Sequence, residues 1–256
     1  MLAGYGSSTS SGSITIRTVN SGNSGVSGRL SFSSGTTSNG DSGTLSIGTG
    51  AATSGKAGSI SVTVGAGNTL SGGNILVAAG ESTAKSGGTI DVVTGYGRAT
   101  SSGDIAVATA DAGANGVSGA LSFKSGTTSV GVSGSITMET GRATNGRGGS
   151  VAISVGSGTD DDGGSITLVA GETTAQDKAG GQVLLSGGQS IDATGAEGGA
   201  VFMSGGAGSS SSGGAVGVRS GIGSSTSSGS ITIRTVNAGN NGVSGRLSFS
   251  SGTTSN

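Results

Sequence analysis

Carboxylates are the residues of this sequence that come closest to a chemical site. Asp160, Asp161 and Asp162 form its one acidic cluster, directly before Gly163 and Gly164. Their oxygen atoms are suited to weak binding of a divalent cation, but a solvated loop with unpaired charges is the favoured interpretation. Histidine and cysteine are absent. Catalysis by histidine, cysteine nucleophiles and the usual zinc sites are therefore excluded.

Two other patterns could be taken for sites. Cleavage of a sugar needs two carboxyl groups that converge, whereas Asp91 and Asp104 fall at different positions of neighbouring repeats. The glycine-rich stretch 205–208 resembles a phosphate-binding loop, but neither a helix start nor the required lysine follows it. We therefore predict no catalytic, cofactor-binding or metal-binding residues, no cofactor and no enzyme activity.

Composition narrows the possible partners. The 256 residues include 58 glycines and no proline. There are 12 basic and 13 acidic residues, which gives a net charge of −1. Nucleic acid is an unsuitable partner because no basic stripe could follow its phosphates. Apolar runs are only a few residues long, so we expect no membrane span. The first residues do not form a signal peptide, and Gly4 already resembles the end of a repeat.

A short repeat organises the whole chain. Each copy has a glycine two residues before a pair of alternating apolar residues, such as Gly12 before Ile14 and Ile16. We number positions from the first apolar residue, which is position 0, so the opening glycine is at −2. Copies are mostly 15 residues apart, and a second glycine stands at +5 in thirteen of sixteen. The opening glycines are Gly12, Gly28, Gly43, Gly58, Gly73, Gly88, Gly103, Gly119, Gly134, Gly149, Gly164, Gly181, Gly199, Gly214, Gly229 and Gly245.

The alternation of apolar and polar residues is typical of strands rather than helices. Two short strands and two glycine corners in about 15 residues predict one coil of a parallel β-solenoid. We thus expect an all-β fold in which residues 1–256 form one continuous solenoid of about sixteen repeats of 15–16 residues. Positions 0 and +2 would face inward. Because ordering so many glycines is costly, hydrogen bonds between repeats and packing of Ala, Ser and Thr would also have to contribute.

A longer repeat is superimposed on the short one. Residues 224–256 repeat residues 7–39 with two differences, Ala238 for Ser21 and Asn241 for Ser24, at an offset of 217 residues. The copies that begin at Ile14, Ile105 and Ile231 are 16 residues long and lack the glycine at +5. This arrangement predicts a segment of a longer protein.

The regularity of the residues expected to face outward distinguishes a surface that recognises a ligand from an ordinary solvent-exposed surface. Threonine occupies position +1 at Thr15, Thr137, Thr167 and Thr232, but charged and bulky residues interrupt the column elsewhere. A regular threonine array would indicate ice binding, and this one is not regular. Outward apolar residues could instead pack on another molecule or be scattered singly; they are Leu76, Val93, Val169, Leu184 and Phe202.

A sequence motif recurs at residues 163–171 and, as a variant, at 133–141. This motif resembles repeats of two kinds of protein. It resembles the very long Gly/Ser/Thr-rich repeat proteins of diatoms and other algae, over the whole chain. It is also similar, locally, to the haemagglutinin-type repeats of bacterial secreted adhesins. Both resemblances imply an exported, fibrous or surface-associated protein, and neither assigns functional residues.

These observations together predict a structural protein that forms an extracellular or surface filament, sheath or coat by stacking of solenoid repeats. Its partner would be the protein itself, joined end to end or laterally, with cell-wall or matrix components as further candidates. The alternative is an adhesive, ice-binding or mineral-binding solenoid with a Ser/Thr-rich outer face.

Overall fold

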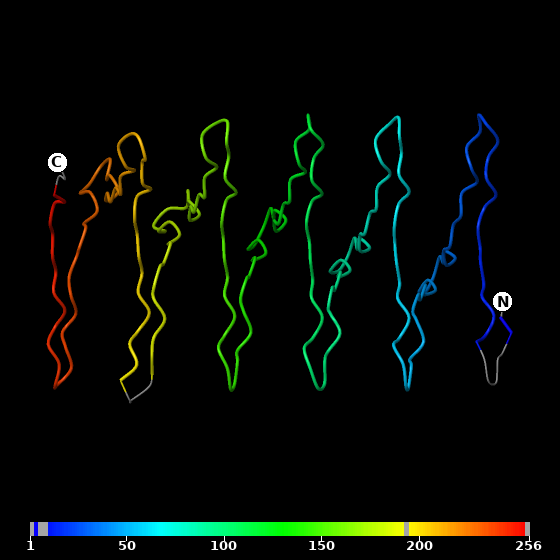
Figure 1. Cartoon of the computed structure of the whole chain (residues 1–256), viewed down its shortest axis with the longest axis horizontal. Helices are drawn as coiled ribbons and strands as arrows, with labels where there is room; N and C mark the ends of the chain where they lie inside the picture. The colour runs from blue at the N-terminus through cyan, green and yellow to red at the C-terminus, as the bar shows by residue number, and fades with distance from the viewer. Residues whose placement is uncertain (1–2, 5–9, 192–194, 254–256) are drawn as a thin grey trace. The chain divides into compact units, whose positions relative to one another are not determined.

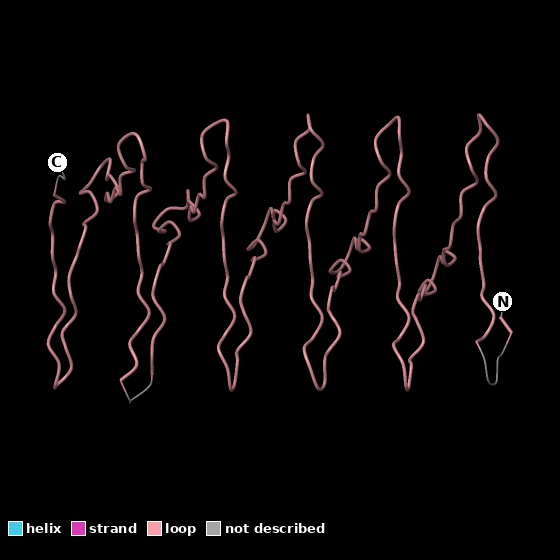
Figure 2. Cartoon of the chain, viewed as in Figure 1, coloured by secondary structure: helices cyan, strands magenta, loops and turns pink. Residues whose placement is uncertain are grey.

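The chain forms loops, turns and bends in the computed structural model, which describes residues 3–4, 10–191 and 195–253. No helix and no strand occurs in these three ranges, and Figure 2 shows all of them as loop. Contacts divide the chain into two units, Met1–Phe123 and Lys124–Asn256. Figure 1 follows the backbone from the blue amino-terminal residues to the red carboxy-terminal ones.

The predicted all-β fold, a parallel β-solenoid of about sixteen repeats with two strands each, is wrong. In a solenoid, equivalent positions of consecutive repeats are joined by a ladder of backbone hydrogen bonds. In the described chain, the backbone hydrogen bonds instead join different positions of neighbouring repeats or close four-residue turns. The ladder that would define strands is therefore missing.

The predicted core is missing as well. None of the described residues is buried. The exposed fraction of the residue at position 0 ranges from 47% at Ile14 to 60% at Val151. The accessible surface of the chain is 25493 Å², more than twice the roughly 9,800 Å² of a compact protein of this mass. Two large apolar residues per repeat bury too little surface to offset the ordering of so many glycines and serines.

The alternation of the sequence nevertheless survives in the local backbone. Position 0 is about half exposed, whereas residues predicted to face outward are much more exposed, from 83% for Val169 to 92% for Phe202. Position +4 belongs to the same side as position 0, since Val64 and Val155 at +4 are 47% and 48% exposed. Positions 0, +2 and +4 of each repeat thus form one more sheltered side, which we name the apolar stripe.

A contact that we name the glycine clasp joins each repeat to the next. In some repeats the amide of the opening glycine donates to the carbonyl oxygen of the preceding glycine at +5, as from Gly88 to Gly80 at 2.9 Å and from Gly214 to Gly206 at 2.8 Å. Where this bond is missing, the opening glycine still lies against the residue at +4, as Gly58 does against Thr49. The Thr49 hydroxyl also donates to the Gly58 carbonyl oxygen at 3.3 Å. Each clasp closes a loop whose two ends are close together, as in an Ω-loop.

The clasp explains the opening glycine through close approach rather than through an unusual backbone conformation. A Cβ atom on Gly28 would lie 3.2 Å from the Thr18 side chain, and one on Gly199 would lie 3.0 Å from the Gly188 nitrogen. Positive φ angles occur elsewhere, and the described glycines that have them are Gly40, Gly131 and Gly195. A side chain at −2 would therefore crowd the preceding repeat at most of these positions, and at Gly73 and Gly164 its Cβ atom would clash with Val64 and Val155 at 2.7 and 2.6 Å.

The three repeats without a glycine at +5 share a different closure. Each has glycines at +8 and +11, and the second donates its amide to the carbonyl oxygen of the first. The distances are 3.3 Å from Gly25 to Gly22, 3.0 Å from Gly116 to Gly113, and 3.2 Å from Gly242 to Gly239. These four-residue turns accommodate the one extra residue of each repeat.

Candidate functional site

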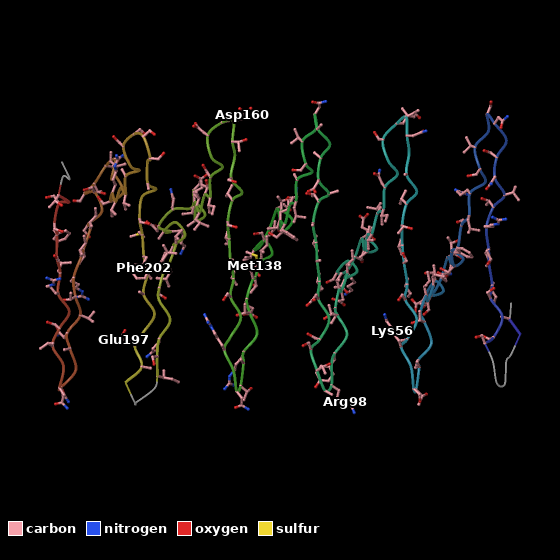
Figure 3. All side chains as sticks on the ribbon, in the orientation of Figure 1. Lys56, Arg98, Met138, Asp160, Glu197 and Phe202 are labelled. Atoms are coloured by element: carbon pink, nitrogen blue, oxygen red, sulfur yellow. The ribbon has the colours of Figure 1, made fainter. Side chains whose placement is uncertain are left out.

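The acidic cluster forms no cation site. Asp160, Asp161 and Asp162 are all exposed, and the one hydrogen bond among them runs from the Asp162 amide to Asp161 Oδ1 at 2.8 Å. Nowhere in the described ranges do three acidic side chains gather around a common point. Figure 3 labels Asp160 at the tip of its loop. The cluster therefore has the geometry of a solvated turn.

The remaining acidic pair is equally open. Asp91 and Asp104 are exposed, and no hydrogen bond joins them in the structure as described. The described residues also enclose no pocket in which two carboxyl groups could act on one substrate. The geometry needed for general acid and base catalysis is thus not formed here.

The glycine-rich stretch 205–208 presents the wrong groups for a phosphate. Gly205 lies directly against the Gly214 carbonyl oxygen, and a Cβ atom on Gly208 would lie 2.6 Å from the carbonyl oxygen of Ser211. Phosphate binding requires backbone N–H donors. Here carbonyl oxygens face the glycines, and the Gly214 amide is already bonded to Gly206.

The outward residues are exposed side chains on separate repeats. Thr15, Thr137, Thr167 and Thr232 are all exposed. The apolar residues Leu76, Val93 and Leu184 are between 84% and 87% exposed. Figure 3 shows the labelled side chain of Phe202 projecting from the backbone. These residues offer surface, but no enclosed site.

The structure brings together residues that the sequence analysis did not single out. Position +4 faces the opening glycine of the following repeat, and it is small or β-branched throughout, as at Ala79, Thr94 and Val155. A third glycine at +7 touches carbonyl groups further along its own loop, as Gly97 does at Thr100 and Ser101. The period-two pattern, extended by one step to +4, could have identified the first of these.

The apolar stripe is thus the feature of the described chain that recurs with constant chemistry. It combines apolar residues at 0 and +2 with a small or β-branched residue at +4. In every repeat it stays exposed to solvent, from 47% at Ile14 to 77% at Phe249 for its large apolar residues. Such a surface can associate with another apolar surface by the hydrophobic effect.

Comparison with protein-family models, with curated proteins and with solved structures finds no match for this chain. A search of the described residues for a helix long and apolar enough to cross a bilayer also finds none.

Proposed function

We propose that this chain is a structural repeat protein that builds an extracellular or cell-surface filament, sheath or coat. Copies of the chain associate through the apolar stripe, so the partner is the protein itself. The location follows from the resemblance to long algal repeat proteins and to secreted adhesins. The observation that carries the proposal is the exposure of the same apolar stripe in all sixteen repeats.

The exposed surface is large enough for extensive association. The chain exposes 25493 Å², whereas a compact protein of this mass exposes roughly 9,800 Å². A stable protein interface buries only about 1,600 Å² in total. Several interfaces of that size could therefore form before the surface of one chain resembled that of a folded domain.

A second copy is the occupant that fits the stripe best. Its stripe has the same spacing of about 15 residues, so one contact brings the neighbouring repeats of both chains into position for the next. Linked contacts of this kind strengthen one another by raising the effective concentration. A net charge of −1 adds little repulsion between copies.

Association also supplies what the single chain lacks. A chain that cannot bury enough apolar surface alone can become ordered when it binds, and the binding energy then offsets the ordering cost. The outward residues and the loops would remain at the surface of the assembly. The repeat number would thereby determine the strength of assembly.

The test compares two matched variants in sedimentation velocity and electron microscopy over a dilution series. The stripe variant carries Ile75→Ser, Ile90→Ser, Val183→Ser and Val201→Ser. The control carries Leu76→Ser, Val93→Ser, Leu184→Ser and Phe202→Ser, which change outward residues of the same four repeats. We expect assemblies of the unaltered chain and of the control.

The stripe variant should need at least about tenfold more protein to assemble, because each replaced side chain removes on the order of 1 kcal/mol of burial. An unaltered chain that stays monomeric at every concentration would contradict self-association. Equal weakening by both variants would show that the stripe is not the associating surface.

A further inference from the structure

Four Asn-Gly pairs lie in exposed loops of this chain. They are Asn39-Gly40, Asn115-Gly116, Asn145-Gly146 and Asn241-Gly242. In such a pair, the backbone nitrogen of glycine can attack the side-chain amide carbon of asparagine. A bond forms between the glycine nitrogen and asparagine Cγ, the Cγ–Nδ2 bond breaks, and ammonia leaves. One water molecule then opens the succinimide ring to aspartate or isoaspartate.

The four pairs differ in what their attacking nitrogen does. The Gly116 amide donates to the Gly113 carbonyl oxygen at 3.0 Å, and the Gly242 amide donates to that of Gly239 at 3.2 Å. The amides of Gly40 and Gly146 make no hydrogen bond within the described chain. An amide that donates a hydrogen bond is harder to deprotonate and is held in one orientation. Attack on asparagine requires both deprotonation and reorientation.

Space around the glycines divides the pairs in the same way. A Cβ atom on Gly116 would lie 3.4 Å from the Ala112 side chain, and one on Gly242 would lie 3.6 Å from that of Ala238. The same atom on Gly40 or Gly146 would have no neighbour within 4 Å. Gly40 also has a φ angle of 114°. The Thr37 hydroxyl bonds to the carbonyl oxygen of Gly40 and leaves its nitrogen open.

We propose that Asn39 and Asn145 are modification sites at which the chain converts itself to aspartate or isoaspartate, whereas Asn115 and Asn241 are protected by their turns. Each unit of the chain then contains one reactive site and one protected site. Every conversion adds one negative charge to a chain whose net charge is −1. The modification would therefore slowly increase repulsion between copies.

The experiment follows all four sites by peptide mass spectrometry during incubation of the dilute intact chain in mildly alkaline buffer. Cleavage after lysine and arginine places the four pairs in four different peptides. A parallel incubation in concentrated urea removes the turns. Because all four sites share the same Asn-Gly chemistry, each protected site serves as a control for the reactive site of its own unit. Replacement of Asn39 by Gln confirms the assignment of the first peptide.

In buffer, we expect Asn39 and Asn145 to be converted several-fold faster than Asn115 and Asn241. In urea, the four rates should become similar. Equal rates in buffer would overturn the proposal, because the turns would then give no protection. A difference that persists in urea would overturn it too, because the cause would then be the neighbouring sequence.

Discussion

At the scale of single residues, the need for glycine depends on what lies beside each position: some glycines touch neighbouring atoms, and many others have open space around them. Two adjacent glycines can therefore differ completely in their tolerance of a side chain. Gly205 lies directly against the carbonyl oxygen of Gly214, whereas a Cβ atom on Gly206 would meet nothing within 4 Å. Because the neighbour of Gly205 is backbone, no rotation of a side chain can relieve the clash.

This difference predicts opposite effects of two neighbouring substitutions. Gly205→Ala should open the clasp, in which the Gly214 amide donates to the Gly206 carbonyl oxygen at 2.8 Å. A typical hydrogen bond contributes about 0.5–1.5 kcal/mol, so protection of the Gly214 amide from hydrogen exchange should fall a few-fold to roughly tenfold. This protection is measured by amide hydrogen exchange monitored by NMR. Gly206→Ala is the control and should leave it unchanged; equal losses in both variants would show that contact at Gly205 is not the cause.

At the scale of the repeat, the way in which the loop is closed depends on whether the repeat has a glycine at +5. All repeats have the contact between the opening glycine and the residue at +4, and the three repeats that begin at Ile14, Ile105 and Ile231 add a four-residue turn. In one of these turns, the Ser21 hydroxyl donates to the Gly25 carbonyl oxygen at 2.8 Å. The equivalent residues of the other two turns are Ala112 and Ala238, which have no hydroxyl group.

Because Ala112 and Ala238 occupy the position of Ser21 in the other two turns, we predict that the hydrogen bond of the Ser21 hydroxyl is not needed for the turn. Ser21→Ala should retain the bond from the Gly25 amide to Gly22, because the two turns with alanine keep theirs at 3.0 and 3.2 Å. Protection of the Gly25 amide should therefore change less than about threefold, below the effect of a typical hydrogen bond. Gly25→Val provides the contrast, because a Cβ atom there already lies 3.3 Å from the Ser21 side chain. A loss of protection in Ser21→Ala as large as in Gly25→Val would contradict this view.

Sequence reasoning was sufficient for the repeat and for its alternation, and it failed at the step from repeat to fold. The alternating pattern correctly predicts that Ile166 and Leu168 are less exposed than Val169. It does not determine whether equivalent residues of successive repeats meet, because that depends on burial gained across the whole chain against the ordering cost of its glycines. The Asp160–Asp162 cluster shows the same limit, since neighbouring positions in sequence do not make three carboxylates converge.

At the scale of the whole molecule, the decisive quantity is the surface that remains exposed. A fully extended chain of this mass exposes roughly 34,000 Å², and this one exposes 25493 Å². Only about a quarter of the available surface is therefore covered, against about 70–75% in compact domains of similar size. Cooperative unfolding needs a core that is lost in a single step, and the described residues contain no buried side chain from which to form one.

The last prediction follows from this small coverage and separates the single chain from its assemblies. A compact domain of 256 residues has an unfolding heat capacity change of roughly 3–4 kcal/mol/K. The dilute chain should show less than half of that, and its calorimetric trace should lack a cooperative peak. At concentrations where copies associate, a peak should appear and move to higher temperature with concentration, because association stabilises the bound form by mass action. The stripe variant, which carries serine at Ile75, Ile90, Val183 and Val201, should shift the onset of this peak to higher concentration. A cooperative peak in the dilute chain that does not depend on concentration would contradict both the open structure and its ordering by association.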